Sequence, residues 1–330
     1  MHGTPFFLPE NNFYVPDRNR YNLYRPIIAT VLQKQIRASI ISLLILSCNR
    51  EAVNMIASKT FKFSILLPLL LILSFLPIPK PANAETELIV FAAASMTESM
   101  NMIAEVYKRS APDVKTLFNF DSSGTLKTQI EQGADCDIFI SAGQKQMDQI
   151  DISADPSVNT KKLDLIMPGT RFNIVSNKVV LITAKNGSSK GIKNFQDLVT
   201  EKVSLVSIGN SDVPAGQYAT EVFKALDVWE KLTAMNKISY ASNVKEVLSQ
   251  VSTGAVDCGI VYSTDAATSE AVKVIAEAPK GSHRPITYPA ALIKGTKNQK
   301  AASEFVKFLK GPESAGIFKK VGFSIPRQDK

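Results

Sequence analysis

The chain has 330 residues, of which 45% are hydrophobic and 21% charged, a composition typical of globular proteins. Its formal net charge is +8, but nine of its 38 basic and only three of its 30 acidic residues precede residue 85. The remainder keeps 29 basic and 27 acidic side chains, a net charge of +2, so we expect no nucleic-acid partner.

Residues 55–84 have the three parts of a secretory signal peptide. Lys59 and Lys62 precede the apolar run 63–78, and the sequence 81–84 (PANA) ends in an A-x-A cleavage pattern. The apolar run is short for a membrane span and is interrupted by a proline. We therefore predict cleavage after the last alanine and a periplasmic location.

Residues 1–54 precede this signal peptide, and Met55 would be a natural start for it. We interpret 1–54 as an upstream extension or the product of a start codon assigned too early. The alternative is a genuine extension whose apolar piece 40–46 leads to a lipoprotein attachment at Cys48. Cleavage after Ala84 would leave 246 residues, enough for two lobes of ordinary size.

From residue 88 on, apolar runs of strand length alternate with helical patterns, which is typical of βαβ units and a mostly parallel sheet. The first run, Leu88–Phe91, is unbroken, as in a strand buried on both faces. The predicted strands are 88–91, 114–120, 137–140, 179–183, 203–208, 259–262, 272–275 and 290–293. Four helices are predicted at 126–132, 195–199, 217–226 and 301–309. Two more begin after Ser95 and after Ala142, and two further helices end near Val251 and near Phe323.

Two segments of the chain resemble each other. Residues 133–141 (GADCDIFIS) and 254–263 (GAVDCGIVYS) each follow a helix and lead into a strand. The similarity indicates two lobes built on one plan, although helix–glycine–strand units also look alike by chance. Cys136 and Cys258 would then occupy equivalent, buried places in different lobes, so we predict two free thiols.

Four predicted helix starts carry residues suited to binding an anion. Ser95, the pair 122–123, the pair 215–216 and Val244 all lie where backbone N–H groups lack intrahelical partners and the helix dipole is positive. Any one of them alone is more often an N-cap. Four such starts, two from each lobe, would form an anion site if they faced a shared cleft.

Such a site would offer donors only. A fully ionised oxyanion presents only acceptors and therefore needs hydrogen-bond donors. Phosphate keeps a proton at neutral pH, and that proton requires an acceptor in the site. Asp121 is the one obvious acceptor in these turns. Sulfate, molybdate and tungstate are therefore favoured, and size must separate them. Tyr262 would add a phenolic donor, or else serve as a core tyrosine.

Enzymatic interpretations have little support. Ser123 lacks a histidine in a supporting context, since His283 is the only histidine after the leader, and no Walker A, G-x-S-x-G or G-x-G-x-x-G motif occurs. Asp135, Asp137 and Asp257 flank strands and fit loop and cap positions better than a metal cluster. We predict no enzyme, no catalytic residue and no site for a free metal cation.

Five separated motifs together resemble the periplasmic molybdate-binding proteins of ABC transporters. The match runs in order from about residue 86 to 326, nearly all of the predicted mature chain. It is specific because the motifs agree with one another, while any single one would be weak. The motifs are FAAASMTESM, SSGTLKTQIEQGADCDIFISA, VPAGQYATEVFKAL, VDCGIVYSTDA and FLKGPESAGIFKKVGF.

The resemblance implies a set of ligand-binding residues. It implies that the oxyanion accepts hydrogen bonds from the hydroxyls of Ser95, Ser123 and Tyr262 and from the backbone N–H groups of Ala215 and Val244. Molybdenum would be bound only as its oxyanion, with no further cofactor. Three neighbouring residues would support these five: Ser122, Thr125 and Gly216.

The resemblance also implies the architecture, a type II periplasmic-binding-protein fold. Each lobe would be a mostly parallel α/β sheet flanked by helices, and strands near 171–180 and 276–288 would cross between the lobes as a hinge. Residues 85–175 with 280–330 would form lobe 1, and residues 176–279 lobe 2.

The implied function is binding of molybdate and tungstate by a monomer. The loaded protein would deliver the anion to a membrane permease that has a cytoplasmic ATPase. The alternatives are a binding protein for another tetrahedral oxyanion such as sulfate and, less favoured, an anion-binding hydrolase or transferase. Gly124 departs from the family pattern, because many relatives carry a third serine there.

Overall fold

The computed structural model describes residues 85–186 and 191–326. The predicted upstream segment 1–54, with Cys48, and the predicted signal peptide 55–84 lie outside these residues. Within the described ranges, no helix combines the length and the apolar character needed to cross a membrane.

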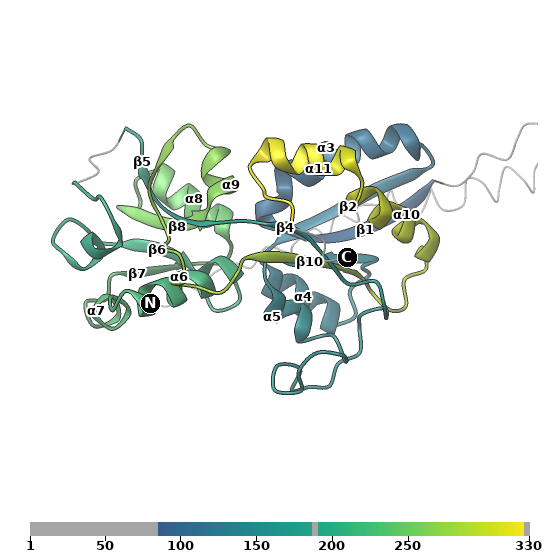
Figure 1. The fold of residues 1–330 in the computed structure, drawn as a ribbon, viewed down its shortest axis with the longest axis horizontal. Helices are drawn as coiled ribbons and strands as arrows, with labels where there is room; N and C mark the ends of the chain where they lie inside the picture. Colours follow the sequence, from purple (N-terminus) through teal and green to yellow (C-terminus); the bar gives the residue numbers. More distant parts are fainter. Residues whose placement is uncertain (1–84, 187–190, 327–330) are drawn as a thin grey trace, which may run out of the picture. The chain divides into compact units, whose positions relative to one another are not determined.

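Two five-stranded sheets form the centres of two lobes (Figure 1). The first has the order β2-β1-β3-β10-β4, in which β1 runs parallel to β2 and β3, and β10 runs antiparallel to β3 and β4. We call this sheet and the helices packed on it lobe 1. Its strands are β1 (Thr86–Ala93), β2 (Val114–Asp121), β3 (Ile138–Ile140), β4 (Phe172–Ser176) and β10 (Thr287–Leu292).

The second sheet, the centre of lobe 2, repeats this plan. Its order is β7-β6-β8-β5-β9, with β6 parallel to β7 and β8, and β5 antiparallel to β8 and β9. The repeated segments of the sequence lead into β3 and β8, which hold the same middle position, so the prediction of two similar lobes is confirmed. The strands are β5 (Val179–Ala184), β6 (Val206–Gly209), β7 (Ile238–Ala241), β8 (Cys258–Tyr262) and β9 (Val272–Glu277).

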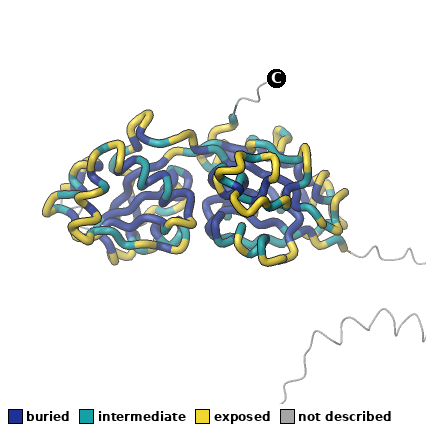
Figure 2. Tube along the Cα trace, turned by 90° about the horizontal axis from the view of Figure 1, so that it is seen from below, coloured by how far each residue is buried: buried dark blue, intermediate teal, exposed yellow. Residues whose placement is uncertain are grey.

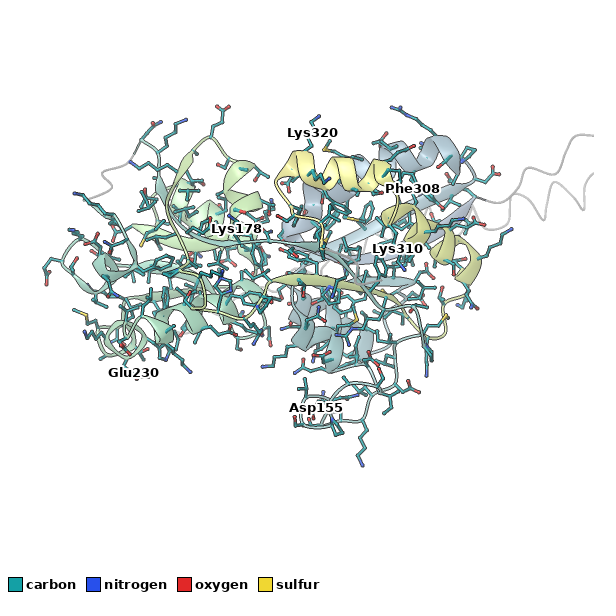
Figure 3. All side chains as sticks on the ribbon, in the orientation of Figure 1. Asp155, Lys178, Glu230, Phe308, Lys310 and Lys320 are labelled. Carbon is teal, nitrogen blue, oxygen red and sulfur yellow. The ribbon has the colours of Figure 1, made fainter. Side chains whose placement is uncertain are left out.

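The chain crosses between the two sheets twice among the described residues. It passes from β4 to β5 through Asn177 and Lys178, which is labelled at this crossing in Figure 3, and returns from β9 to β10. The crossing strands run antiparallel to their neighbours, so each sheet is mixed. The Asn177 amide donates to Thr264 Oγ1 (2.9 Å) in lobe 2 and to Tyr288 Oη (3.2 Å) in lobe 1, which ties the hinge to both lobes.

Helices cover the faces of both sheets and bury regularly spaced apolar residues. Met100, Ile103 and Tyr107 form the buried stripe of the first long helix. Lobe 1 carries η1 (Ala94–Met96), α3 (Thr97–Ser110), α4 (Ser123–Glu131), α5 (Gln144–Asp148), α10 (Gln299–Leu309) and α11 (Pro312–Val321). Lobe 2 carries η2 (Phe195–Val199), α6 (Pro214–Ala225), α7 (Trp229–Ala234), α8 (Val244–Ser252) and α9 (Ser263–Ala267).

Strand β7 and two short helices were not predicted from the sequence, and β4 was expected only as part of the crossing near 171–180. Strands β4 and β7 each lie at the edge of a sheet and have one neighbour. Because an edge strand is partly exposed, its sequence lacks a continuous apolar run, and Tyr240 in β7 is 55% exposed. Helices α7 and α9 have six and five residues, too few to show a helical period.

Both cysteines of the described chain are free and buried, as predicted. Figure 2 shows the buried residues concentrated inside each lobe, and the two thiols belong to different sheets. Cys136 lies just before β3 and Cys258 begins β8. Burial raises the pKa of both thiols well above its usual value.

We therefore expect the native protein to resist thiol reagents. Buried thiols that stay protonated are poor nucleophiles, so Cys136 and Cys258 should react only after unfolding. Titration with an Ellman-type reagent, without reductant, should give no rapid reaction in buffer and two thiols in denaturant after leader cleavage. Rapid labelling of the native protein, or no thiol after unfolding, would contradict this arrangement.

Candidate functional site

The helix starts singled out in the sequence meet at one small cavity. Its volume is only about 10 Å³, and it is lined from both lobes by the end of β1, the starts of α4, α6 and α8, and the end of β8. The five predicted ligand-binding residues all line it, and so does Ser122. The lining residues are Ala93, Ala94, Ser95, Asp121, Ser122, Ser123, Ala142, Val213, Pro214, Ala215, Val244 and Tyr262.

Two serine hydroxyls from lobe 1 are buried at this cavity. Ser95 Oγ lies 2.9 Å from Tyr288 Oη, with which it shares a hydrogen bond. Ser123 Oγ accepts the N–H of Ala142 (2.9 Å), which leaves the Ser123 hydroxyl proton available to a ligand. Both serines are at most 3% exposed, so their hydroxyls are oriented by protein contacts.

The turn before α4 is fixed by two neighbours of Ser123. Ser122 is the N-cap, and its Oγ accepts the N–H of Thr125 (3.1 Å) and lies 2.8 Å from Thr125 Oγ1. Ser122 and Thr125 therefore satisfy the helix start with each other. The hydroxyl of Ser123, the first helical residue, is left for the cavity.

Lobe 2 contributes backbone donors at the starts of two helices. Asn243 caps α8 by accepting the N–H of Glu246 (3.0 Å), and Pro214 begins α6, which has no side-chain cap. Within the described parts of the chain, no hydrogen-bond acceptor is found for the N–H of Ala215 or Val244. These first-turn donors are of the kind that helices leave for caps, water or ligands.

Gly216 allows α6 to lie directly on the end of β6. A Cβ at this position would be 2.0 Å from the carbonyl oxygen of Gly209, the last residue of β6. Any other residue would push the helix away, so this glycine fixes the position of Ala215. Gly216 itself is not among the described lining residues of the cavity, which makes it a supporting residue.

The cavity contains neutral donors and a single ionisable carboxylate among its described lining residues, that of Asp121. Its Oδ1 accepts the N–H of Ser122 (2.7 Å) and the amide of Asn243 (3.3 Å). The Tyr262 hydroxyl donates to the carbonyl of Ala142 (3.3 Å), and burial raises its pKa well above the usual 10. Tyr262 therefore stays protonated at neutral pH and acts as a donor.

Several hydrogen-bonded contacts join the lobes around the cavity, and that of Tyr262 in lobe 2 with Ala142 in lobe 1 is one of them. The Gly124 N–H donates to the carbonyl of Asp212 (3.0 Å), and Asn243 donates to Asp121 as described. Lys245 Nζ, on α8, lies 2.7 and 2.9 Å from the two carboxylate oxygens of Glu98 on α3. The starts of helices in one lobe are thus held against those of the other.

Lys245 also faces a fully buried carboxylate. Asp265 on α9 is 0% exposed, and its Oδ1 lies 3.2 Å from Lys245 Nζ. Burial raises the pKa of Asp265 from its ordinary 3.8 to about 6, even though Lys245 favours the ionised form. Glu98, on the far side of Lys245, adds to the rise.

This raised pKa predicts a pH-dependent effect of Asp265→Asn. An acid whose pKa is higher in the folded state contributes stability below its unfolded pKa, and this is lost as pH rises through about 6. The asparagine avoids that loss, so its unfolding free energy should match the parent near pH 4 and exceed it above pH 7 by up to about 3 kcal/mol. Urea denaturation across this pH range measures the difference, and a variant less stable than the parent at pH 7.5 would contradict it.

Sequence reasoning did not identify three residues that shape the site. Ala142, Tyr288 and Asn177 each hydrogen-bond a predicted site residue or join the lobes. Ala142 acts through its backbone, which no side-chain pattern reveals. Tyr288 lies outside the predicted strand 290–293, because Pro289 interrupts the apolar run by which that strand was identified.

The aspartates beside the strands have structural partners. Asp137 Oδ2 accepts the N–H of Ile89 (2.7 Å), and Asp257 Oδ2 accepts the N–H groups of Ser204 and Leu205. Across residues 85–186 and 191–326, no group of three or more histidine, cysteine or acidic residues could hold a metal ion.

Comparison with known proteins gives consistent matches. The family described as bacterial extracellular solute-binding protein matches residues 88–324. The molybdate-binding protein ModA of Escherichia coli is 37% identical over 247 residues, 73% of this chain and 90% of that protein. ModA of Haemophilus influenzae is 35% identical over 244 residues, 73% of this chain and 91% of that protein. The solved periplasmic molybdate-binding protein of Azotobacter vinelandii has a TM-score of 0.63 at 27% identity, covering 73% of this chain and all of that one.

Proposed function

Because the chain belongs to the bacterial extracellular solute-binding protein family, we propose that it binds molybdate, and tungstate with it, in the cavity between its lobes. The observation that carries the proposal is the convergence of five predicted donors on one cavity. Two relatives at 35–37% identity and one solved neighbour are named molybdate-binding proteins. The ligand would be held by Ser95, Ser123, Ala215, Val244 and Tyr262.

The donor set fits a fully ionised tetrahedral oxyanion. Three hydroxyls and two backbone N–H groups supply hydrogen bonds to four acceptor oxygens, and hydrogen bonds to charged groups are stronger than neutral ones. A small, largely buried cavity strengthens them further, because little water competes. No lysine, arginine or histidine is among the described lining residues, so the charge would be stabilised by oriented dipoles.

Selectivity would follow from protonation and size. Hydrogen phosphate needs an acceptor for its proton, and Asp121 supplies the one carboxylate among the described lining residues, with Oδ1 already accepting two hydrogen bonds. Sulfate has the same charge and shape as molybdate but shorter bonds. The second candidate function is therefore binding of sulfate or another tetrahedral oxyanion at the same residues.

Binding would be coupled to transport. An anion that accepts hydrogen bonds from both lobes stabilises the closed arrangement, in which the lobes meet around the cavity. We infer that a monomer in this form docks on a membrane permease with a cytoplasmic ATPase and releases the anion when the lobes part. For this role we propose a periplasmic location after cleavage at Ala84. The lobe boundaries would lie in the two crossings, between Ser176 and Val179 and between Glu277 and Thr287.

A catalytic function has no comparable support. Asp121 is the one described lining residue with a carboxylate that could act as a general base, and its Oδ1 already accepts two hydrogen bonds, while His283, the one described histidine, does not line the cavity. We therefore propose a binding protein that takes no cofactor and no free metal ion, with molybdenum entering only as its oxyanion.

Calorimetric titration of the purified protein with molybdate, tungstate, sulfate and phosphate tests this function. We expect tight 1:1 binding of molybdate and tungstate and a much weaker response to the other two. Preference for sulfate would reassign the ligand while keeping the site. No heat with any of the four would refute the proposal.

A further inference from the structure

We propose that Gly124 is a positioning residue for the ligand in this chain, because a Cβ at this position would stop the two lobes from closing far enough for both donor sets to reach one anion. This inference rests on the proposed function. It extends that function to a residue that does not line the cavity.

Gly124 makes a direct backbone contact between the lobes. It is the second residue of α4 in lobe 1, next to Ser123, and its N–H donates to the carbonyl of Asp212 in lobe 2 at 3.0 Å. Asp212 lies just before α6, which carries Ala215. The contact therefore joins two of the helix starts that face the cavity.

A Cβ at position 124 would overlap the opposite lobe. It would lie 2.4 Å from Asp212 O, 2.6 Å from Asp212 Cβ and 2.8 Å from Asp212 Cα, where real Cβ atoms keep at least 3.0 Å. Its three nearest atoms all belong to Asp212, so the overlap exists only while the lobes are closed. Gly124 has no positive φ that would strain another residue.

The overlapping atoms have little freedom to yield. Two of the three belong to the Asp212 backbone, and the turn that carries them is fixed by hydrogen bonds from Asp212 N–H to Asn210 Oδ1 (2.9 Å) and from Val213 N–H to Asn210 O (3.0 Å). The interlobe contacts of Tyr262, Asn243 and Lys245 are each made by a side chain, which can adjust more easily than a contact between two backbone segments. The Gly124 contact therefore sets how closely the lobes approach.

A side chain at position 124 would widen the site. Raising the contact from 2.4 Å to 3.0 Å requires about 0.6 Å of separation, and ordinary contact at 3.4 Å requires about 1 Å. Hydrogen bonds weaken steeply over such distances, so an anion seated on Ser95 and Ser123 would lose donors from lobe 2. Loss of even one hydrogen bond to a charged ligand lowers affinity about tenfold or more.

The test compares Gly124→Ala with Gly316→Ala in the full protein. Gly316 is exposed on α11, has no atom within 4 Å of a built Cβ, and serves as the matched control. Calorimetric titration with molybdate should show binding at least about tenfold weaker for Gly124→Ala and unchanged for Gly316→Ala. Thermal unfolding without ligand should be the same or slightly higher for Gly124→Ala, because the open lobes carry no overlap.

A second measurement separates closure from folding. Small-angle scattering should show that molybdate compacts the parent and the control, whereas Gly124→Ala at saturating molybdate stays more expanded. Equal affinity and equal compaction in Gly124→Ala would overturn the inference. If the parent itself bound none of the oxyanions, the proposed function would fail instead.

Discussion

Ser123→Ala is expected to weaken molybdate binding about 10- to 150-fold and also to destabilise the ligand-free protein. The lost hydroxyl is a donor to a charged ligand, which accounts for about 1.5–3 kcal/mol of affinity. The same oxygen accepts the N–H of Ala142, a residue only 3% exposed. Leaving that N–H without an acceptor should lower the unfolding free energy by about 1–3 kcal/mol.

Ser95→Ala provides an informative comparison. Its partner, the Tyr288 hydroxyl, also receives the Asn177 amide, so truncation of Ser95 leaves no group wholly without a partner. We expect a similar loss of affinity with a smaller loss of stability.

Ser252→Ala is the neutral control for both variants. Ser252 ends α8, at the opposite end of the helix from Val244. Titration calorimetry and urea denaturation measure the two effects separately. Molybdate binding by Ser123→Ala as tight as that of the parent would show that the site is assigned wrongly.

Gly216→Ala is expected to abolish or severely weaken binding through the backbone. The added methyl would lie 2.0 Å from the carbonyl oxygen and 2.5 Å from the carbonyl carbon of Gly209. Because backbone atoms cannot rotate away, α6 must shift by about 1 Å to restore a 3.0 Å contact. Overpacking of this kind costs about 1–3 kcal/mol of stability.

The shift of α6 would carry the Ala215 N–H out of hydrogen-bonding range. Gly316→Ala again serves as the control, since its built Cβ meets nothing within 4 Å. Titration calorimetry with molybdate, at a temperature where Gly216→Ala is still folded, measures the affinity of the folded variant. We expect that affinity to be lower than the parent's, so the loss of binding does not come from unfolding alone. A variant with parental affinity and parental stability would mean that α6 is not fixed by this contact.

The local features of the site could be predicted because they are written in short stretches of sequence. Ser122, Asn243 and Pro214 are residues that begin helices for known physical reasons, and each does so here. Unbroken apolar runs located β1, β3, β5 and β8. The helices after the central strands were therefore predicted, although α4 and α6 each begin three residues before the predicted 126 and 217.

The contacts between lobes could not be predicted in the same way. Gly124 and Asp212 are 88 positions apart, and the role of each depends on how closely two separate sheets approach. Ala142 contributes through its N–H and carbonyl, which are common to nearly all residues. The edge strand β7 was missed, and the edge strand β4 was expected only as part of a crossing, because neither has the continuous apolar run that identified the central strands.

The most direct test of the central claim is a crystal structure of the protein grown with molybdate, with the metal located by its anomalous scattering. We expect one strong peak in the cavity, with oxyanion oxygens within hydrogen-bonding distance of the hydroxyls of Ser95, Ser123 and Tyr262. The N–H groups of Ala215 and Val244 should point at the same anion. A molybdenum peak elsewhere, or a site in which charged side chains hold the anion, would contradict it.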